Sequence, residues 1–200
     1  MYHISLYFDE KTTAYMHKLI EKVAQATGND YMLEAEVPPH ITLCALECEE
    51  EVLMERLEYV FDRGGASAKQ RNVIVSAHGG REVRSASVLK QGTLQWVSIG
   101  TFLPGVIFVQ PVLNGYLQGL MELVYACVQG SCEQAQDCMQ RRENAFCATP
   151  KDCKNMVPDV KIKPCYKPFS WLPHSTVAKK LTSEQLTHAF AVLQKRVQSV

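Results

Sequence analysis

The sequence predicts a mixed α and β protein built as two similar halves, and three observations support this prediction. First, an order of strand, helix, strand and helix is expected once near each end of the 200-residue chain. Second, the later strand of each half carries a proline, a histidine and, two positions after the histidine, a threonine. Third, the chain is long enough to bury a core, and it is 46% hydrophobic and 21% charged, as is typical of a globular domain.

The first half begins with an alternating apolar segment and ends with an acidic helix. Residues 2–8 have the alternation of a strand, and residues 11–27 have apolar side chains at helical spacing, with Gly28 as a C-terminal stop. Residues 40–46 are β-branched and apolar, which predicts the strand that carries the first motif. Residues 49–61 predict a second helix, because acidic residues fill its first turn and an apolar face follows.

The second half repeats this order with little sequence identity. Residues 105–110 predict a strand and residues 113–128 a helix, in spite of two glycines. Residues 171–178 predict the strand that carries the second motif. A last helix is expected over 183–197, capped by Thr182 or Ser183. Three further strands are expected between the halves, at 72–78, 83–90 and 94–102.

The second half also contains a cysteine-rich segment, residues 129–165, that has no counterpart in the first. It holds five of the eight cysteines, and we interpret it as an insertion that is part helix and part loop. The segment contains no pair of cysteines separated by two residues and no histidine, so the spacing does not predict a zinc site. We expect buried or free thiols, and no metal or cofactor.

Composition and charge restrict the partners. No apolar run is long enough to span a bilayer, and the N-terminus does not read as a signal peptide, so we expect a cytoplasmic monomer without a membrane partner. Positive charge is local, with nine basic and three acidic residues in 151–200. This distribution favours a small phosphate group or a short oligonucleotide over a long duplex.

The two motifs can form one acid–base site. In a strand, residues two apart point to the same face, so His40 lies beside Thr42 and His174 beside Thr176, about 6–7 Å apart. If the two halves pack about a pseudo-twofold axis, both pairs meet in one cleft. One imidazole can act there as general base and the other as general acid, while the threonine hydroxyls hydrogen-bond the phosphate oxygens. Such a site suits a phosphodiester and requires no metal.

This arrangement resembles the two-histidine (2H) phosphoesterase superfamily, which includes the RNA 2′,5′-ligase-like proteins and the cyclic phosphodiesterases. The resemblance lies in "HIT" (40–42), in "HST" (174–176) and in "SIGTFLPGVIFVQPV" (98–112), which looks like the strand–turn–strand that opens the second lobe of the family. It covers nearly the whole chain except 129–165 and 79–92. It implies an α+β fold, a pseudo-twofold duplicated βα(β)βα unit with two antiparallel sheets facing a central cleft. We expect one bilobal domain over 1–200, with lobes at about 1–102 and 103–200.

The activity that the resemblance implies is metal-independent hydrolysis, with His40 and His174 as catalytic residues. The substrate would be a nucleotide or RNA end with a 2′,3′-cyclic phosphate or a 2′–5′ linkage, and Thr42 and Thr176 would bind its phosphate. Two alternatives use the same residues. One is RNA 2′,5′-ligation, the reverse reaction, and the other is a nucleotide-binding module without turnover.

Further residues are weaker candidates for this site. Tyr166, Lys167 and Trp171 are candidates for substrate binding, because charged and aromatic side chains precede the second motif, and Tyr7 is a candidate because it lies near the end of the first strand. The alternative is that the lysines are solvated and the aromatic side chains anchor the strand. Residues 1–62 hold 13 acidic and 4 basic side chains, so we expect their charge to keep His40 protonated and favour it as the acid. The remaining histidines are expected to be structural: His3, His17, His78 and His188.

Overall fold

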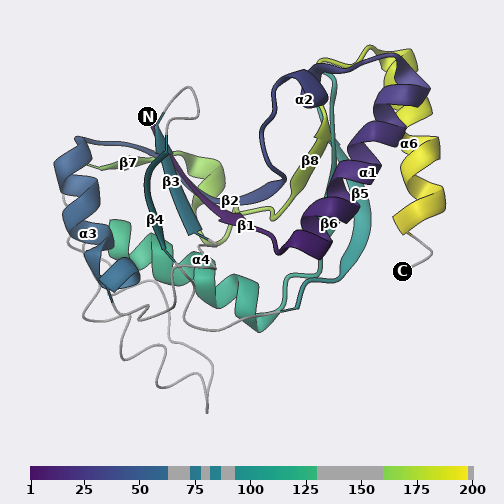
Figure 1. The fold of residues 1–200 in the computed structure, drawn as a ribbon. Helices are drawn as coiled ribbons and strands as arrows, with labels where there is room; N and C mark the ends of the chain where they lie inside the picture. Colours follow the sequence, from purple (N-terminus) through teal and green to yellow (C-terminus); the bar gives the residue numbers. More distant parts are fainter. Residues whose placement is uncertain (63–72, 78–81, 87–92, 130–159, 198–200) are drawn as a thin grey trace. The chain divides into compact units, whose positions relative to one another are not determined.

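The fold is known from a computed structural model, which describes residues 1–62, 73–77, 82–86, 93–129 and 160–197 (Figure 1). Strands and helices form a mixed α and β fold with two sheets, and the strands β3 to β6 follow one another without a helix between them in the described residues. This confirms the predicted α+β class. No helix in these ranges is long and apolar enough to cross a membrane.

The strands and helices of both predicted repeats are present. The strands are β1 (Tyr2–Tyr7), β2 (His40–Glu47), β3 (Val73–Ala77), β4 (Glu82–Ala86), β5 (Trp96–Phe102), β6 (Val106–Pro111), β7 (Lys161–Ile162) and β8 (Ser175–Ala178). The helices are α1 (Glu10–Thr27), α2 (Tyr31–Glu34), α3 (Glu50–Asp62), α4 (Gly115–Val128), α6 (Ser183–Val197) and the 3₁₀ helix η2 (Pro164–Tyr166). Among the described residues, three short elements were not predicted, α2, β7 and η2, because each is too short to show a hydrophobic period.

One sheet has five strands in the order β4-β3-β1-β2-β7, and the other has three in the order β5-β6-β8. The pairs β2–β7 and β3–β4 in the first sheet and β5–β6 and β6–β8 in the second are antiparallel. In the three-stranded sheet β6 is central, and its register places Phe108 opposite Gly100 of β5 and opposite Thr176 of β8. This register determines which side chains stand beside the second motif.

The chain divides into two compact units that differ from the predicted lobes 1–102 and 103–200. The first unit comprises Met1–Ser5, Leu43–Gly92 and Asn114–Leu172. The second comprises Leu6–Thr42, Thr93–Leu113 and Pro173–Val200. Each unit therefore takes segments from both predicted lobes, and the residues of both histidine motifs fall in the second unit.

In the second unit, two helices pack against the three-stranded sheet. Helices α1 and α6 lie against each other, α1 also contacts β8, and α6 contacts β5 and β6 (Figure 1). Ile107 and Val109 on β6 and Leu193 on α6 have no exposed surface. The Gln185 side chain donates to the Thr27 carbonyl at 2.8 Å, which joins the end of α1 to the start of α6. These contacts bury one face of the three-stranded sheet against α1 and α6.

The ends of these helices agree with the sequence signals. Gly28 ends α1 with φ +65°, and its N–H donates to the Ala24 carbonyl at 2.7 Å. Thr182, rather than Ser183, caps α6: the Thr182 hydroxyl accepts from the Gln185 N–H, and the Gln185 side chain accepts from the Thr182 N–H. This reciprocal pair satisfies two backbone donors at the start of α6.

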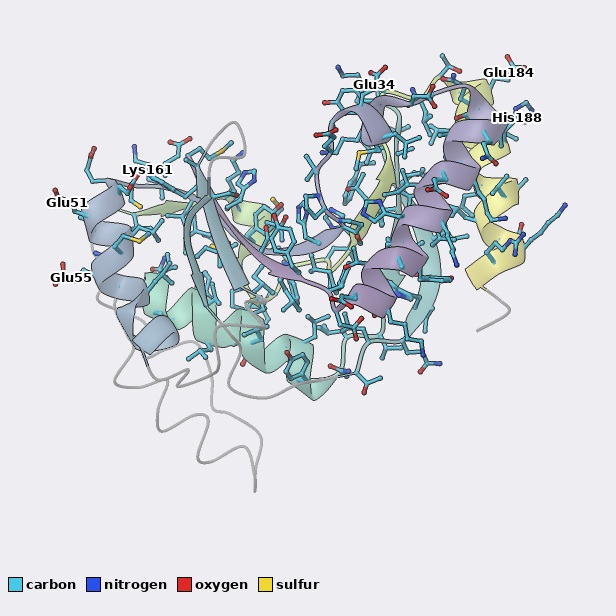
Figure 2. All side chains as sticks on the ribbon, viewed as in Figure 1. Glu34, Glu51, Glu55, Lys161, Glu184 and His188 are labelled. Carbon is cyan, nitrogen blue, oxygen red and sulfur yellow. The ribbon has the colours of Figure 1, made fainter. Side chains whose placement is uncertain are left out.

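In the first unit, α3 packs against α4 (Figure 1). Leu53 and Leu57 of α3 are buried, whereas Glu51 and Glu55 of the same helix are exposed (Figure 2). The Arg56 guanidinium donates to the Val128 carbonyl at 2.7 Å and so binds the C-terminal end of α4. Burying the apolar face of α3 against α4 is what the helical period of the sequence predicts.

Some predictions shift or lie outside the described residues. The strand predicted over 171–178 begins only at Ser175, because Pro173 has no N–H to donate to a strand ladder and His174 precedes the first paired residue. The helix and loop predicted within 129–165 fall mostly outside the described residues, as does His78. Lys161, at the start of β7, is described and exposed (Figure 2).

Candidate active site

Each histidine of the repeated motif lies at the start of a strand, and both lie in the second unit. His40 is the first residue of β2, and His174 directly precedes the first residue of β8. Thr42 and Thr176 follow two positions later, and all four side chains are partly exposed, whereas Ile41 and Ser175 between them have no exposed surface. The alternation predicted for the motifs therefore holds: the outer residues reach solvent and the middle residue packs inward.

The His40 ring is oriented by a backbone carbonyl two residues earlier in the chain. Its Nδ1 lies 2.9 Å from the carbonyl oxygen of Pro38. Since a carbonyl can only accept, Nδ1–H must be the donor. In the neutral imidazole, Nε2 then carries the lone pair, which is the form that can accept a proton.

The surroundings of His40 favour this neutral form. Burial is the largest cause and lowers the pKa of His40 below its ordinary value of 6.5. The hydrogen bond to Pro38 opposes this shift, and the positive charges of Lys179 and His174 add to it. The expectation that acidic surroundings keep His40 protonated is therefore wrong, since burial and the positive charges of Lys179 and His174 lower its pKa.

The same interaction shows that the structure brings the two motifs together. A positive charge on His174 is the smallest of the causes that lower the pKa of His40, so the two imidazoles lie within electrostatic reach of each other. Tyr7, predicted as a neighbour of the site, lies beside His40 with 5.3 Å between ring centroids and 34° between ring planes. The sequence predicted these three side chains as parts of one site.

Two phenylalanines that were not predicted surround His174. Its ring centroid is 4.9 Å from that of Phe108 and 5.0 Å from that of Phe102, the second contact being edge-to-face. The two phenylalanine rings are themselves 4.4 Å apart. His174 therefore packs against two aromatic rings, which restrict the rotation of its imidazole.

A glycine leaves the space that the Phe108 ring occupies. Gly100 of β5 faces Phe108 across the sheet, and a Cβ placed on Gly100 would overlap ring atoms Cε2 and Cζ of Phe108. The Phe108 ring therefore lies over the Gly100 backbone. A glycine within a strand is itself a signal of close approach, and it could have indicated this contact from the sequence.

Three weaker candidates belong to the first unit: Tyr166, Lys167 and Trp171. Trp171 is only 7% exposed, as expected of an aromatic side chain that anchors the chain before β8. Lys167 is exposed and ends the 3₁₀ helix η2. A role for these residues in substrate binding stays a prediction.

Two of the histidines predicted to be structural are exposed on helices of the second unit. His17 lies on α1 and His188 on α6, where Figure 2 shows it at the surface. Neither lies on a strand or carries the histidine–threonine spacing of the motifs. They provide reference histidines for experiments on His40 and His174.

Within the described ranges, no group of three or more His, Cys, Asp or Glu side chains is arranged to hold a metal ion. The four cysteines in these ranges, Cys44, Cys48, Cys127 and Cys165, are free thiols. A comparison with protein-family models finds no match to the chain, and neither does a comparison with curated proteins. The resemblance to the 2H phosphoesterases therefore stays a prediction from the motifs.

Proposed function

We propose that the protein is a metal-independent phosphodiesterase of the 2H type, with the duplicated fold of that superfamily. It would open a 2′,3′-cyclic phosphate, or cleave a 2′–5′ linkage, on a nucleotide or RNA end. The observation that carries the proposal is that His40 and His174, each with a threonine two residues later, lie in one compact unit and within electrostatic reach of each other. A neutral and a protonated imidazole at one phosphate are what acid–base catalysis of this reaction needs.

The lowered pKa of His40 supports an assignment of the two roles. Because this pKa lies below 6.5, His40 is mainly neutral at pH 7, with Nε2 available to accept a proton. His40 is therefore the general base in the hydrolytic direction, and His174 is the general acid. The positive charges of Lys179 and His174 that lower the pKa of His40 also favour an anionic phosphate beside it.

The step balances with these two groups and water alone. Nε2 of His40 takes a proton from water while the water oxygen bonds to phosphorus. The bond between phosphorus and one ribose oxygen breaks, and protonated His174 gives its proton to that oxygen. The product is a phosphate monoester, and Thr42 and Thr176 can donate hydrogen bonds to the non-bridging oxygens as their charge grows.

Hydrolysis of 2′,3′-cyclic nucleotides in the presence of EDTA tests the proposal. We expect turnover by the wild type, and a loss of about 10²- to 10⁴-fold in kcat for His40→Ala and for His174→Ala. His188→Ala is the matched control, since it removes an exposed histidine of the same unit and should leave kcat unchanged.

Two outcomes would overturn the proposal. Unchanged turnover after either motif substitution would remove that histidine from the mechanism. Binding of a cyclic nucleotide by the wild type without any product would instead support the nucleotide-binding alternative. Joining of RNA ends to a 2′–5′ linkage by the same two histidines would show the ligase direction.

A further inference from the structure

The face of the three-stranded sheet that carries His174 also carries further side chains from the neighbouring strands. Thr176 of β8, Phe108 of β6 and Gly100 of β5 are directly paired across the sheet, so they share one face. Gln110, two residues after Phe108, and its partner Ser98, two residues before Gly100, share this face as well. His174 contacts the ring of Phe108, which places its imidazole on the same side.

Ser98 and Gln110 form a polar pair in this otherwise aromatic neighbourhood. The Ser98 hydroxyl donates to Oε1 of Gln110 at 3.0 Å, and a Cβ on Gly100 would lie 3.3 Å from that oxygen. Gln110 is half-buried, and Ser98 is exposed. In the described part of the chain, Ser98 is the one hydrogen-bond partner of the Gln110 side chain, so its Nε2 is available as a donor.

A fixed amide beside a catalytic histidine suits recognition of a neutral acceptor. Because the Ser98 hydroxyl donates to Oε1, the Nε2 end of the amide is the end left to donate. A mononucleotide whose phosphate lies at His174 and Thr176 has its base nearby, and adjacent strands lie only about 5 Å apart. Keto oxygens on bases accept from such an amide, whereas an amino group in the same place does not.

We propose that Gln110, oriented by Ser98, determines specificity by donating a hydrogen bond to a keto oxygen of the substrate nucleobase. The inference rests on the proposed function, because it places the phosphate of a nucleotide at His174 and Thr176. It adds a substrate class to that function: nucleotides with keto bases are preferred over those with an amino group at the same ring position. Neither Gln110 nor Ser98 takes part in the acid–base step.

Equilibrium binding to the His40→Ala variant tests this proposal without consuming the ligand. The probes are two matched pairs of 2′,3′-cyclic nucleotides, inosine against adenosine and uridine against cytidine, which differ by a keto or an amino group. We expect the keto member of each pair to bind about 3- to 10-fold more tightly, as for one hydrogen bond at a partly exposed site. Adding Gln110→Met should abolish the preference and leave the affinity for the amino member unchanged.

Two further variants test whether the preference depends on the orientation of the Gln110 amide rather than on an intact fold. Ser98→Ala removes only the exposed hydroxyl that fixes the amide, and it should reduce the preference. Ser98→Thr retains a hydroxyl and should preserve it. A thermal unfolding curve for each variant checks that the sheet is intact.

Failure of this proposal is distinguishable from failure of the proposed function. Equal binding within both pairs, or a preference that survives Gln110→Met, would overturn the role of Gln110 even if the wild type hydrolyses all four nucleotides. A preference that depends on Gln110 without turnover by the wild type would overturn the hydrolytic function alone. If none of the four nucleotides binds, the role of Gln110 is overturned whatever the activity.

Discussion

Phe108 lies against His174, with 4.9 Å between the ring centroids, and it is itself only 2% exposed. Its ring occupies the space above Gly100 on the neighbouring strand. A buried residue without catalytic chemistry therefore connects the backbone of β5 to the imidazole expected to act as the acid. This relationship makes the position of His174 sensitive to a substitution that touches neither histidine.

Gly100→Ala should reduce both stability and activity. The added methyl group overlaps the Phe108 ring, and a ring that is 2% exposed has little room to move. We expect a loss of about 1–3 kcal/mol in the free energy of unfolding, typical of an overpacked core, and a lower kcat through displacement of His174. Urea unfolding and turnover of a cyclic nucleotide measure the two effects.

Gly115→Ala is the control for Gly100→Ala. Nothing lies within 4 Å of a Cβ at Gly115, which is the first residue of α4. Alanine there should leave stability within about 0.5 kcal/mol of the wild type or raise it, since alanine favours helix. Equal effects of the two substitutions would contradict the account of Gly100.

The pH dependence of kcat/KM should show the lowered pKa of His40. A general base must be unprotonated, so activity rises with pH through the pKa of His40 and the acidic limb lies below pH 6.5. Lys179→Gln removes a positive charge that lowers this pKa, so the limb should move to higher pH. Lys195→Gln on α6 removes the same charge elsewhere and should not move it. An acidic limb above pH 6.5 in the wild type would assign the base to another group.

Adjacent residues of the second motif should respond in opposite ways to loss of a hydroxyl. Ser175 has no exposed surface, and its hydroxyl has no hydrogen-bond partner among the described residues. Ser175→Ala should therefore be neutral or stabilise the protein by up to about 1 kcal/mol, with activity retained. Thr176→Val keeps the side-chain shape but loses the hydroxyl proposed to donate to the phosphate, and kcat should fall about 10²-fold. Unfolding and turnover measured on both variants test this contrast, and inactivation by Ser175→Ala would contradict it.

The described cysteines should differ widely in reactivity. Burial raises the pKa of the Cys44 thiol to about 12, so almost none of it is thiolate at pH 8. Cys127 is also buried, whereas Cys165 is exposed. Brief alkylation of the native protein, followed by peptide mapping, should label Cys165 and leave Cys44 and Cys127 unlabelled until the chain is unfolded. Labelling of Cys44 before Cys165 would contradict the burial of β2.

The sequence predicted the features that depend on local periodicity. The helix over Glu10–Thr27 and the strand from His40 were predicted within one residue of their bounds, because their apolar periods are long and capped. The pairing of His40 with His174 followed from the repeated motif. These features need no knowledge of which strands are neighbours.

The remaining features depend on register and burial. Phe102, Phe108 and Gln110 adjoin the site only because β6 pairs with both β5 and β8, and a single sequence does not show that pairing. The charge state of His40 follows from burial and from Lys179, which is far from it in sequence. An expectation from the net charge of residues 1–62 therefore had the wrong sign.

The central claim is that His40 and His174 act in one chemical step, and the rates of four proteins test it most directly. These are the wild type, His40→Ala, His174→Ala and the double variant, compared in single-turnover hydrolysis of one 2′,3′-cyclic nucleotide. If the pair acts as a unit, the double variant should be about as slow as the slower single variant, because residues of one catalytic unit are strongly non-additive. Losses that multiply in the double variant, or a single variant as fast as the wild type, would contradict the claim.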